Sequence, residues 1–208
     1  RGDLEAALSS WEEALALASW LTPRQRGALH SNLGAALVDT GQPEAGRSHL
    51  LAALACFEQE GTPMNHAIAH GNLALLALQM RDMAALADHS QRARQHAQRG
   101  DYRRGLALSD LLDAVAAAHA QDGVAARALL TRGLTAFAEQ GIAESLNQRL
   151  AAEAFMALGD RAAAATAAAE ALRLAAPFPV ELRAAQAMSR RVTGAPAAAP
   201  LPSHPSTT

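Results

Sequence analysis

The sequence predicts an all-α protein, a solenoid of stacked antiparallel helix pairs with about ten helices. The first observation is a repeat of 40 residues, by which Thr22-Pro23 recurs as Thr62-Pro63 and the segment 30–35 (HSNLGA) recurs at 70–75 (HGNLAL). A fixed period of this length is typical of stacked repeats. The second observation is composition: half of the 208 residues are hydrophobic, only 3% are aromatic, and alanine is abundant. Alanine is the best helix former, whereas residues that favour sheets are scarce here.

Capping residues, prolines and glycines mark the helices of the first half. Thr22 is a favourable N-cap and Pro23 suits the first helical position, so a helix is expected to start there. Gly41 ends that helix, because glycine adopts a left-handed conformation at low cost. The same signals recur in the following unit. The helices predicted from them span residues 3–20, 23–40, 43–60, 63–80 and 83–98.

The second half repeats the pattern with weaker punctuation. Gly100-Asp101 stands where Thr-Pro is expected, and Asp122-Gly123 and Gly159-Asp160 separate the helices of the third and fourth units. Two prolines then end the pattern, and one further helix is expected to cover the open end. A cap of this kind keeps the last apolar face out of water. The helices predicted here span residues 102–121, 124–140, 143–158, 161–175 and 180–192.

Two regions follow from this organisation: a helical repeat domain over residues 1–193 and a flexible tail over residues 194–208. The tail reads GAPAAAPLPSHPSTT, in which proline, alanine and serine prevail and too little apolar bulk is present to offset the entropy of ordering. The chain starts at Arg1, inside what reads as a repeat, so we expect it to be a piece of a longer protein.

Composition also narrows the classes of partner. A net charge of −2 does not favour nucleic acid or a membrane surface, and the sequence has neither a long apolar run nor a signal-peptide pattern. Cys56 is the single cysteine, which excludes an internal disulfide and a zinc-thiolate cluster and favours a cytoplasmic location. All 18 basic residues are arginine, which indicates a GC-rich, bacterial genome.

The helix pairs resemble tetratricopeptide (TPR) repeats over about residues 2–175. The family's helix-turn-helix unit carries Leu-Gly in the first helix, a glycine at the turn, and a small residue in the second helix. Arg81 stands where the second unit's glycine belongs, and the period of about 40 residues exceeds the family's usual 34. The chain resembles the long-helix TPR arrays of bacterial regulators and peptide-pheromone receptors. The matching residues are Leu33-Gly34, Leu37, Gly41, Gly46, Leu50 and Ala53 in the first unit, Leu73-Ala74 and Ala93 in the second, and Gly159, Ala164 and Ala171 in the fourth.

This resemblance implies a right-handed superhelix whose first helices line a concave groove for an extended peptide. Asn32 and Asn72 precede the motif's leucine, where the family often uses asparagine to hold a peptide backbone. A side-chain amide suits that role because it offers a donor and an acceptor together. The alternative is that each asparagine bonds to a neighbouring helix or loop. Helical spacing adds further groove residues, namely Ala35, Asp39, Ile68, Leu75, Gln79, Leu112 and His119.

Other polar residues have structural interpretations. His30 and His70 occupy a position that is usually apolar in the family, and we expect packed, hydrogen-bonded imidazoles there. His66 and His70 could supply two metal ligands, which fall short of a normal site, so no metal and no cofactor are predicted. The arginine-rich segment 89–104 (HSQRARQHAQRGDYRR) could meet an acidic partner, but a solvated outer helix face is the more typical reading.

The sequence contains no nucleophile with an adjacent base, no phosphate-binding glycine loop and no paired-carboxylate motif, so we expect a binding protein and not an enzyme. The first hypothesis is a protein–protein interaction module, the sensing or recruiting part of a larger bacterial regulator of signalling or transcription. One alternative is a peptide or small-ligand receptor that compacts on binding. Another is a scaffold that forms a homodimer through the alanine-rich stretch Ala152 to Ala169.

Overall fold

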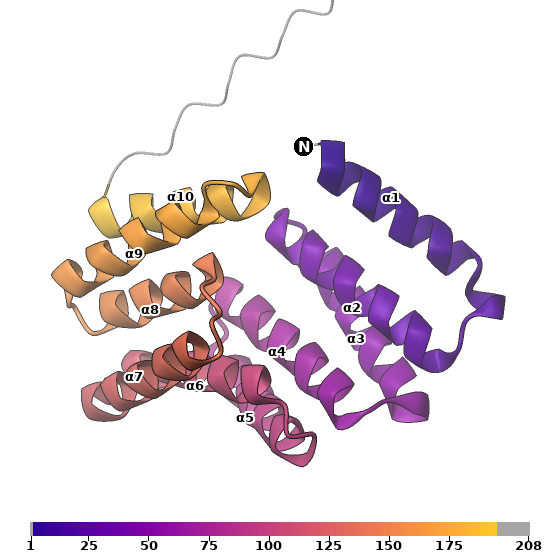
Figure 1. Ribbon diagram of the computed structural model, residues 1–208, viewed down its shortest axis with the longest axis horizontal. Coiled ribbons are helices and arrows are strands. Elements are labelled where there is room, and N and C mark those ends of the chain that lie inside the picture. Colours follow the sequence, from indigo (N-terminus) through magenta and orange to yellow (C-terminus); the bar gives the residue numbers. More distant parts are fainter. Residues whose placement is uncertain (1, 195–208) are drawn as a thin grey trace, which may run out of the picture.

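The structure, a computed structural model, describes residues 2–194, and within that range every element is a helix (Figure 1). This confirms the predicted all-α fold class. The predicted tail after Gly194 lies outside the described residues. The elements are α1 (Gly2–Ala16), a 3-10 helix (Ala18–Trp20), α2 (Pro23–Asp39), α3 (Pro43–Glu60), α4 (Pro63–Gln79), α5 (Met83–Arg99), α6 (Arg103–His119), α7 (Gly123–Glu139), α8 (Ser145–Ala157), α9 (Arg161–Ala175) and α10 (Pro179–Thr193).

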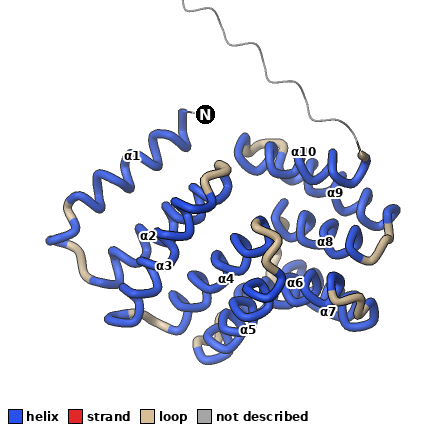
Figure 2. The backbone as a smooth tube through the Cα atoms, turned by 180° about the vertical axis from the view of Figure 1, so that it is seen from behind, coloured by secondary structure: helices blue, strands red, loops and turns tan. Residues whose placement is uncertain are grey.

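Neighbouring helices pack in pairs, and the pairs stack into a helical repeat solenoid. The pairs are α2 with α3, α4 with α5, α6 with α7 and α8 with α9. The first helices also contact one another in sequence, α2 to α4, α4 to α6 and α6 to α8, and α10 packs on α8 and α9. The pairs follow an arc that brings α1 and α2 opposite α10 (Figures 1 and 2). None of the helices within residues 2–194 is both long and apolar enough to cross a membrane.

The N-terminal caps of the helices follow the repeat in the sequence. The Thr22 hydroxyl accepts a hydrogen bond from Gln25 N, and the Gln25 side chain accepts one from Thr22 N, which forms a capping box. Thr62 and Asn65 form the same box at the start of α4. Three of the four second helices use aspartate instead. The N-caps of α5, α7 and α9 are Asp82, Asp122 and Asp160, each accepting from a backbone N–H three residues on, whereas α3 starts at Pro43 without a side-chain cap.

Several helix boundaries differ from the predicted positions, and two of these differences have a clear structural reason. The first helix ends at Ala16 and not near residue 20, and a short 3-10 helix follows it. Leu17 and Trp20 are 62% and 86% exposed, so no packing supports another α-helical turn there. The start of α8 is Ser145, because Gly141 takes a left-handed conformation and Glu144 is extended.

The alanine-rich stretch that suggested a dimer surface lies partly inside the solenoid. Ala152, Ala154, Ala164 and Ala168 are buried, and α8 packs against α9. Small side chains let these two helix axes approach closely. Other alanines of the stretch are exposed on α9, and the homodimer remains a prediction.

The first pair is packed even more tightly, at two glycines. A methyl group added to Gly46 of α3 would lie 2.8 Å from the carbonyl oxygen of Gly34 and 2.6 Å from a methyl carbon of Val38 in α2. Backbone cannot move aside as a flexible side chain can. The two helices therefore approach each other at a distance that only glycine allows.

We expect Gly46→Ala to lower the free energy of unfolding by about 1–3 kcal/mol, the usual cost of overpacking a core. Gly71→Ala is the matched control, since a methyl group there meets only Leu108, at an ordinary 3.5 Å. Removing a mid-helix glycine should raise stability by roughly 0.5–1 kcal/mol. Urea denaturation followed by circular dichroism measures both changes. Equal effects of the two substitutions would contradict the close approach of α2 and α3.

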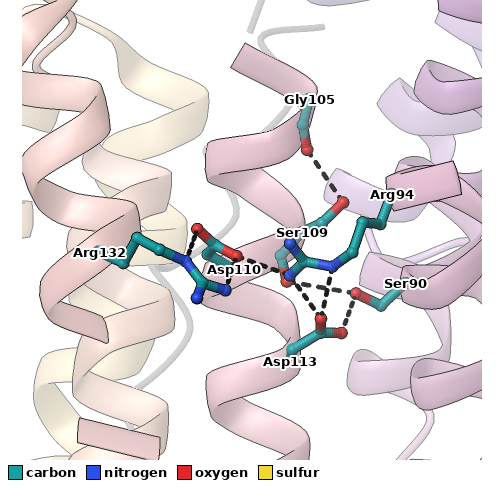
Figure 3. A network of polar contacts seen from close by, with 7 residues as sticks. All are labelled: Ser90, Arg94, Gly105, Ser109, Asp110, Asp113 and Arg132. Carbon is teal, nitrogen blue, oxygen red and sulfur yellow. Dashed lines mark hydrogen bonds and ion pairs between the residues drawn. The ribbon is translucent and has the colours of Figure 1, made fainter. Parts of the chain in front are cut away.

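A buried polar network joins the second pair to the third (Figure 3). Arg94 of α5 reaches both Asp110 (2.7 Å) and Asp113 (2.6 Å) of α6. Asp110 also accepts two hydrogen bonds from Arg132 of α7, and the Ser90 hydroxyl donates to Asp113. The arginine-rich segment 89–104 is thus not wholly a solvated face, because Arg94 points between two helix pairs.

Candidate binding groove

The inside of the arc contains a cavity of about 900 Å³, which we call the inner groove. Four helices that lie inside the stack, α2, α4, α8 and α10, supply most of its walls. The first helix α1 contributes Leu8, so both ends of the described chain border one space. The groove is lined by Leu8, Ala35, Val38, Asp39, Thr40, Gly41, Gln42, Asn72, Leu75, Leu78, Gln79, Leu146, Arg149, Leu150, Glu153, Arg183, Ala184, Ala187, Met188 and Arg191.

Five of the nine predicted groove residues line this cavity: Ala35, Asp39, Asn72, Leu75 and Gln79. They belong to α2 and α4, the first helices of the two units with the clearest repeat. The structure therefore brings this part of the predicted surface together in one place.

Asn32 and Ile68 lie on the same helices but outside the groove lining. Asn32 is exposed, and Ile68 is half-buried. Both precede the lining residues by about one helical turn, nearer the N-terminal ends of α2 and α4. Their predicted contact with a partner remains a prediction.

The two groove amides already have hydrogen-bond partners within the chain. The Asn72 side chain donates to the Ser31 hydroxyl (3.3 Å), and the Gln79 side chain donates to Val38 O (3.3 Å). Both bonds tie α4 to α2, as the alternative interpretation of the asparagines stated. Each amide retains further hydrogen-bonding capacity, so a second contact with a ligand remains open to it.

The expected contribution of α6 differs from the structure. Leu112 is fully buried, so it is a core residue and does not form groove surface. The reason is that α6 packs against α8 on this face, which removes its side chains from the groove wall. His119 also lies outside the lining, and its ring Nε2 is 3.4 Å from a carboxylate oxygen of Glu153.

Glu153 is a buried carboxylate that joins three parts of the fold. It pairs with Arg81, in the turn between α4 and α5, and with Arg191 of α10 (2.8 Å). Burial opposes ionisation, but the hydrogen bonds from Arg191 and Arg81 outweigh it and lower the pKa of Glu153. Arg81 adopts a left-handed conformation (φ 61°), which is unfavourable for a non-glycine residue. Asp101 and Gln121 are also left-handed, in the turns that follow α5 and α6, so the conformation belongs to the turn, and at Arg81 the ion pair ties that turn to α8.

Asp39 and Arg149 face the inner groove from α2 and α8 without forming an ion pair with each other. Burial by the groove walls raises the pKa of Asp39, and the nearby Arg149 charge offsets this in part. Burial likewise lowers the pKa of Arg149, partly offset by Asp39 and Glu181. Arg149 Nε is buried and has no hydrogen-bond partner in the described part of the chain.

The α8 and α10 walls were missed by sequence reasoning. In α8 the lining residues are Leu146, Arg149, Leu150 and Glu153, which share one helix face at intervals of three and four residues. That spacing was visible in the sequence. Which face of α8 turns inward depends on how the fourth pair packs on the third, and the helical period carries no information about that.

The predicted packing of His30 and His70 is confirmed. The Nδ1 atoms of His30 and His49 are 2.9 Å apart, and those of His70 and His89 are 3.2 Å apart. Each contact links the two helices of one pair, at equivalent positions of consecutive repeats. Among residues 2–194, no three side chains of the histidine, cysteine, aspartate and glutamate types are placed to hold one metal ion.

Comparisons with family models, curated proteins and solved structures found no match to this chain.

Proposed function

We propose that the protein is a protein–protein interaction module that binds a peptide or an extended protein segment in the inner groove. As the sequence resemblance to TPR arrays implies, it would serve as the sensing or recruiting part of a larger bacterial regulatory protein. The observation that carries the proposal is the groove itself. At about 900 Å³ it is large enough for several residues of a bound chain, and the rigid inner helices of the stack form its walls.

The composition of the groove supports this proposal. Leu8, Leu75, Leu78, Leu146 and Met188 offer apolar surface that a ligand's side chains could bury. Polar side chains are distributed between them, which suits a ligand with both apolar and backbone polar groups. Stacked helical repeats commonly act by presenting a concave surface of this kind.

A groove-filling substitution tests the proposal. Wild-type protein and an Ala35→Trp variant would be applied to an array of random nonapeptides, with an exposed outer residue of α7 changed in the control, Ala128→Trp. Ala35 lines the groove and Ala128 does not. We expect Ala35→Trp to weaken peptide binding at least about tenfold, a loss of about 1.4 kcal/mol, because the indole occupies ligand space. Circular dichroism confirms that both variants fold. Equal binding by all three proteins would contradict the groove as the binding surface.

A further inference from the structure

The charged residues of the inner groove indicate which peptides it would take. Five of its lining residues are ionisable: Asp39, Arg149, Glu153, Arg183 and Arg191. The arginines outnumber the carboxylates, although the whole chain is slightly acidic. The groove is therefore more positive than the protein around it.

The acidic residues are not equally free to balance these arginines. Glu153 is 3% exposed and is neutralised by Arg81 and Arg191. Arg149 and Arg183 remain, and neither makes an ion pair with any side chain that the structure describes, those of residues 6, 8–17 and 19–194. Of the two acidic residues that line the groove, Asp39 is the one that is left to balance the charges of Arg149 and Arg183.

Arg149 is an arginine of the groove whose pKa is lowered by burial. Its Nε–H is shielded from water and has no acceptor, and leaving a buried donor unpaired costs roughly 1–3 kcal/mol. Four of the buried side-chain atoms in residues 2–194 lack partners, and of these only Arg149 Nε belongs to a residue of the inner groove. Because Arg149 lines the inner groove, a ligand carboxylate in the groove would supply the counter-charge that this partly desolvated guanidinium lacks.

The shape of the guanidinium selects the kind of acceptor. Its planar fork matches a carboxylate, which accepts two parallel charge-assisted hydrogen bonds. The neighbouring groove surface is apolar, since Leu146 precedes Arg149 by one turn on α8 and Leu75 and Leu78 line α4. An acceptor at Arg149 would thus sit between apolar contacts.

We propose that the occupant of the inner groove is a peptide segment in which a carboxylate lies between apolar side chains, and that Arg149 binds this carboxylate with Arg183 adding positive charge. This inference rests on the proposed function, and it adds the ligand's chemistry. The carboxylate comes from an aspartate or glutamate side chain or from the peptide's C-terminus.

The test uses arrays of random nonapeptides, acetylated at the N-terminus and made both as free acids and as C-terminal amides. Wild-type protein is compared with Arg149→Gln and with Arg161→Gln, which removes an exposed arginine from α9, a helix that does not line the groove. We expect wild-type protein to enrich acidic peptides. Arg149→Gln should lose that enrichment and bind the best peptide about tenfold or more weakly, while Arg161→Gln behaves as wild type.

The outcomes separate the two proposals. Enrichment that persists among amidated peptides, and that is lost when glutamate is replaced by glutamine, identifies a side-chain carboxylate, whereas enrichment among free acids alone identifies the C-terminus. Peptides that bind without acidic enrichment, or equally to Arg149→Gln, would overturn the inference and leave the proposed function standing. No binding to any peptide by folded wild-type protein would overturn both.

Discussion

Replacing Arg94 with methionine is expected to lower the free energy of unfolding by about 3 kcal/mol, the lower end of the range for breaking a buried ion pair. The Arg94 side chain is 23% exposed and pairs with Asp110 and Asp113, so its loss leaves two carboxylates short of a partner. Asp110 is 7% exposed and depends on such partners. Burial opposes ionisation, but hydrogen bonds from Arg132 and Arg94 outweigh it and lower the pKa of Asp110.

Arg132→Met is the matched comparison. Arg132 bonds the same carboxylate at 2.6 and 2.7 Å, yet its side chain is 61% exposed, and Arg94 stays on Asp110 after the change. We expect a loss of about 1 kcal/mol or less, as for other exposed pairs. Urea denaturation at pH 7 measures both variants. Equal losses would mean that burial between the second and third helix pairs is not what gives Arg94 its importance.

The helix boundaries show what the sequence predicts well. Helix starts and ends were predictable because they depend on residues within one turn. Thr22 and Thr62 form the same capping box, and each second helix starts after a capping aspartate or a proline. These signals lie wholly in the local sequence, so ten helices could be placed to within a few residues.

The direction in which each helix faces was harder to predict. Leu112 was expected in the groove by analogy with α2 and α4, but α6 lies against α8 and buries it. Arg94 was expected on an outer face, but it turns toward α6. In both cases the answer depends on how one pair rotates on the next. That rotation follows from long-range packing, which the helical period does not contain.

In the inner groove, too, some walls could be predicted from the local sequence and others depend on long-range packing. Its α2 and α4 walls were predictable from the repeat, through Asn72, Leu75 and Gln79. The α8 and α10 walls were not, because they reach the groove only once the arc has formed. Arg149 illustrates this, since it lies 110 residues from Asp39 in the sequence and faces the same cavity.

Acid is expected to destabilise the protein between about pH 6.5 and pH 4, before its buried carboxylates titrate. Burial lowers the pKa of His70 to about 4, and repulsion from His89, His96, Arg92 and His66 adds to the shift. The unfolded chain, with an ordinary histidine pKa of about 6.5, binds protons first, so stability falls as the pH drops through this window. Below about pH 4 both states are protonated and the effect of His70 levels off. His70 alone contributes a loss of up to about 3 kcal/mol.

The contact between His70 and His89 also predicts a loss of stability in acid, independently of the lowered pKa of His70. The Nδ1 atoms of His70 and His89 are 3.2 Å apart, so one ring must accept the hydrogen that the other donates. Two protonated rings would present two donors and two positive charges to each other. Burial also lowers the pKa of His89, which Asp88 offsets only in part, and the pKa of His96, where His66 adds repulsion.

A double substitution, His70→Leu with His89→Leu, should flatten stability across this pH window, because replacing both partners with apolar groups leaves no buried donor unpaired. Urea denaturation at half-unit steps from pH 7 to pH 4 measures the slope. His30→Leu with His49→Leu is the matched control: it removes the equivalent contact in the first pair, where both rings are only half-buried. That control should flatten the slope less, because a more exposed ring keeps more of its water when protonated. An unchanged slope in the first variant would assign the acid sensitivity to groups other than this histidine pair.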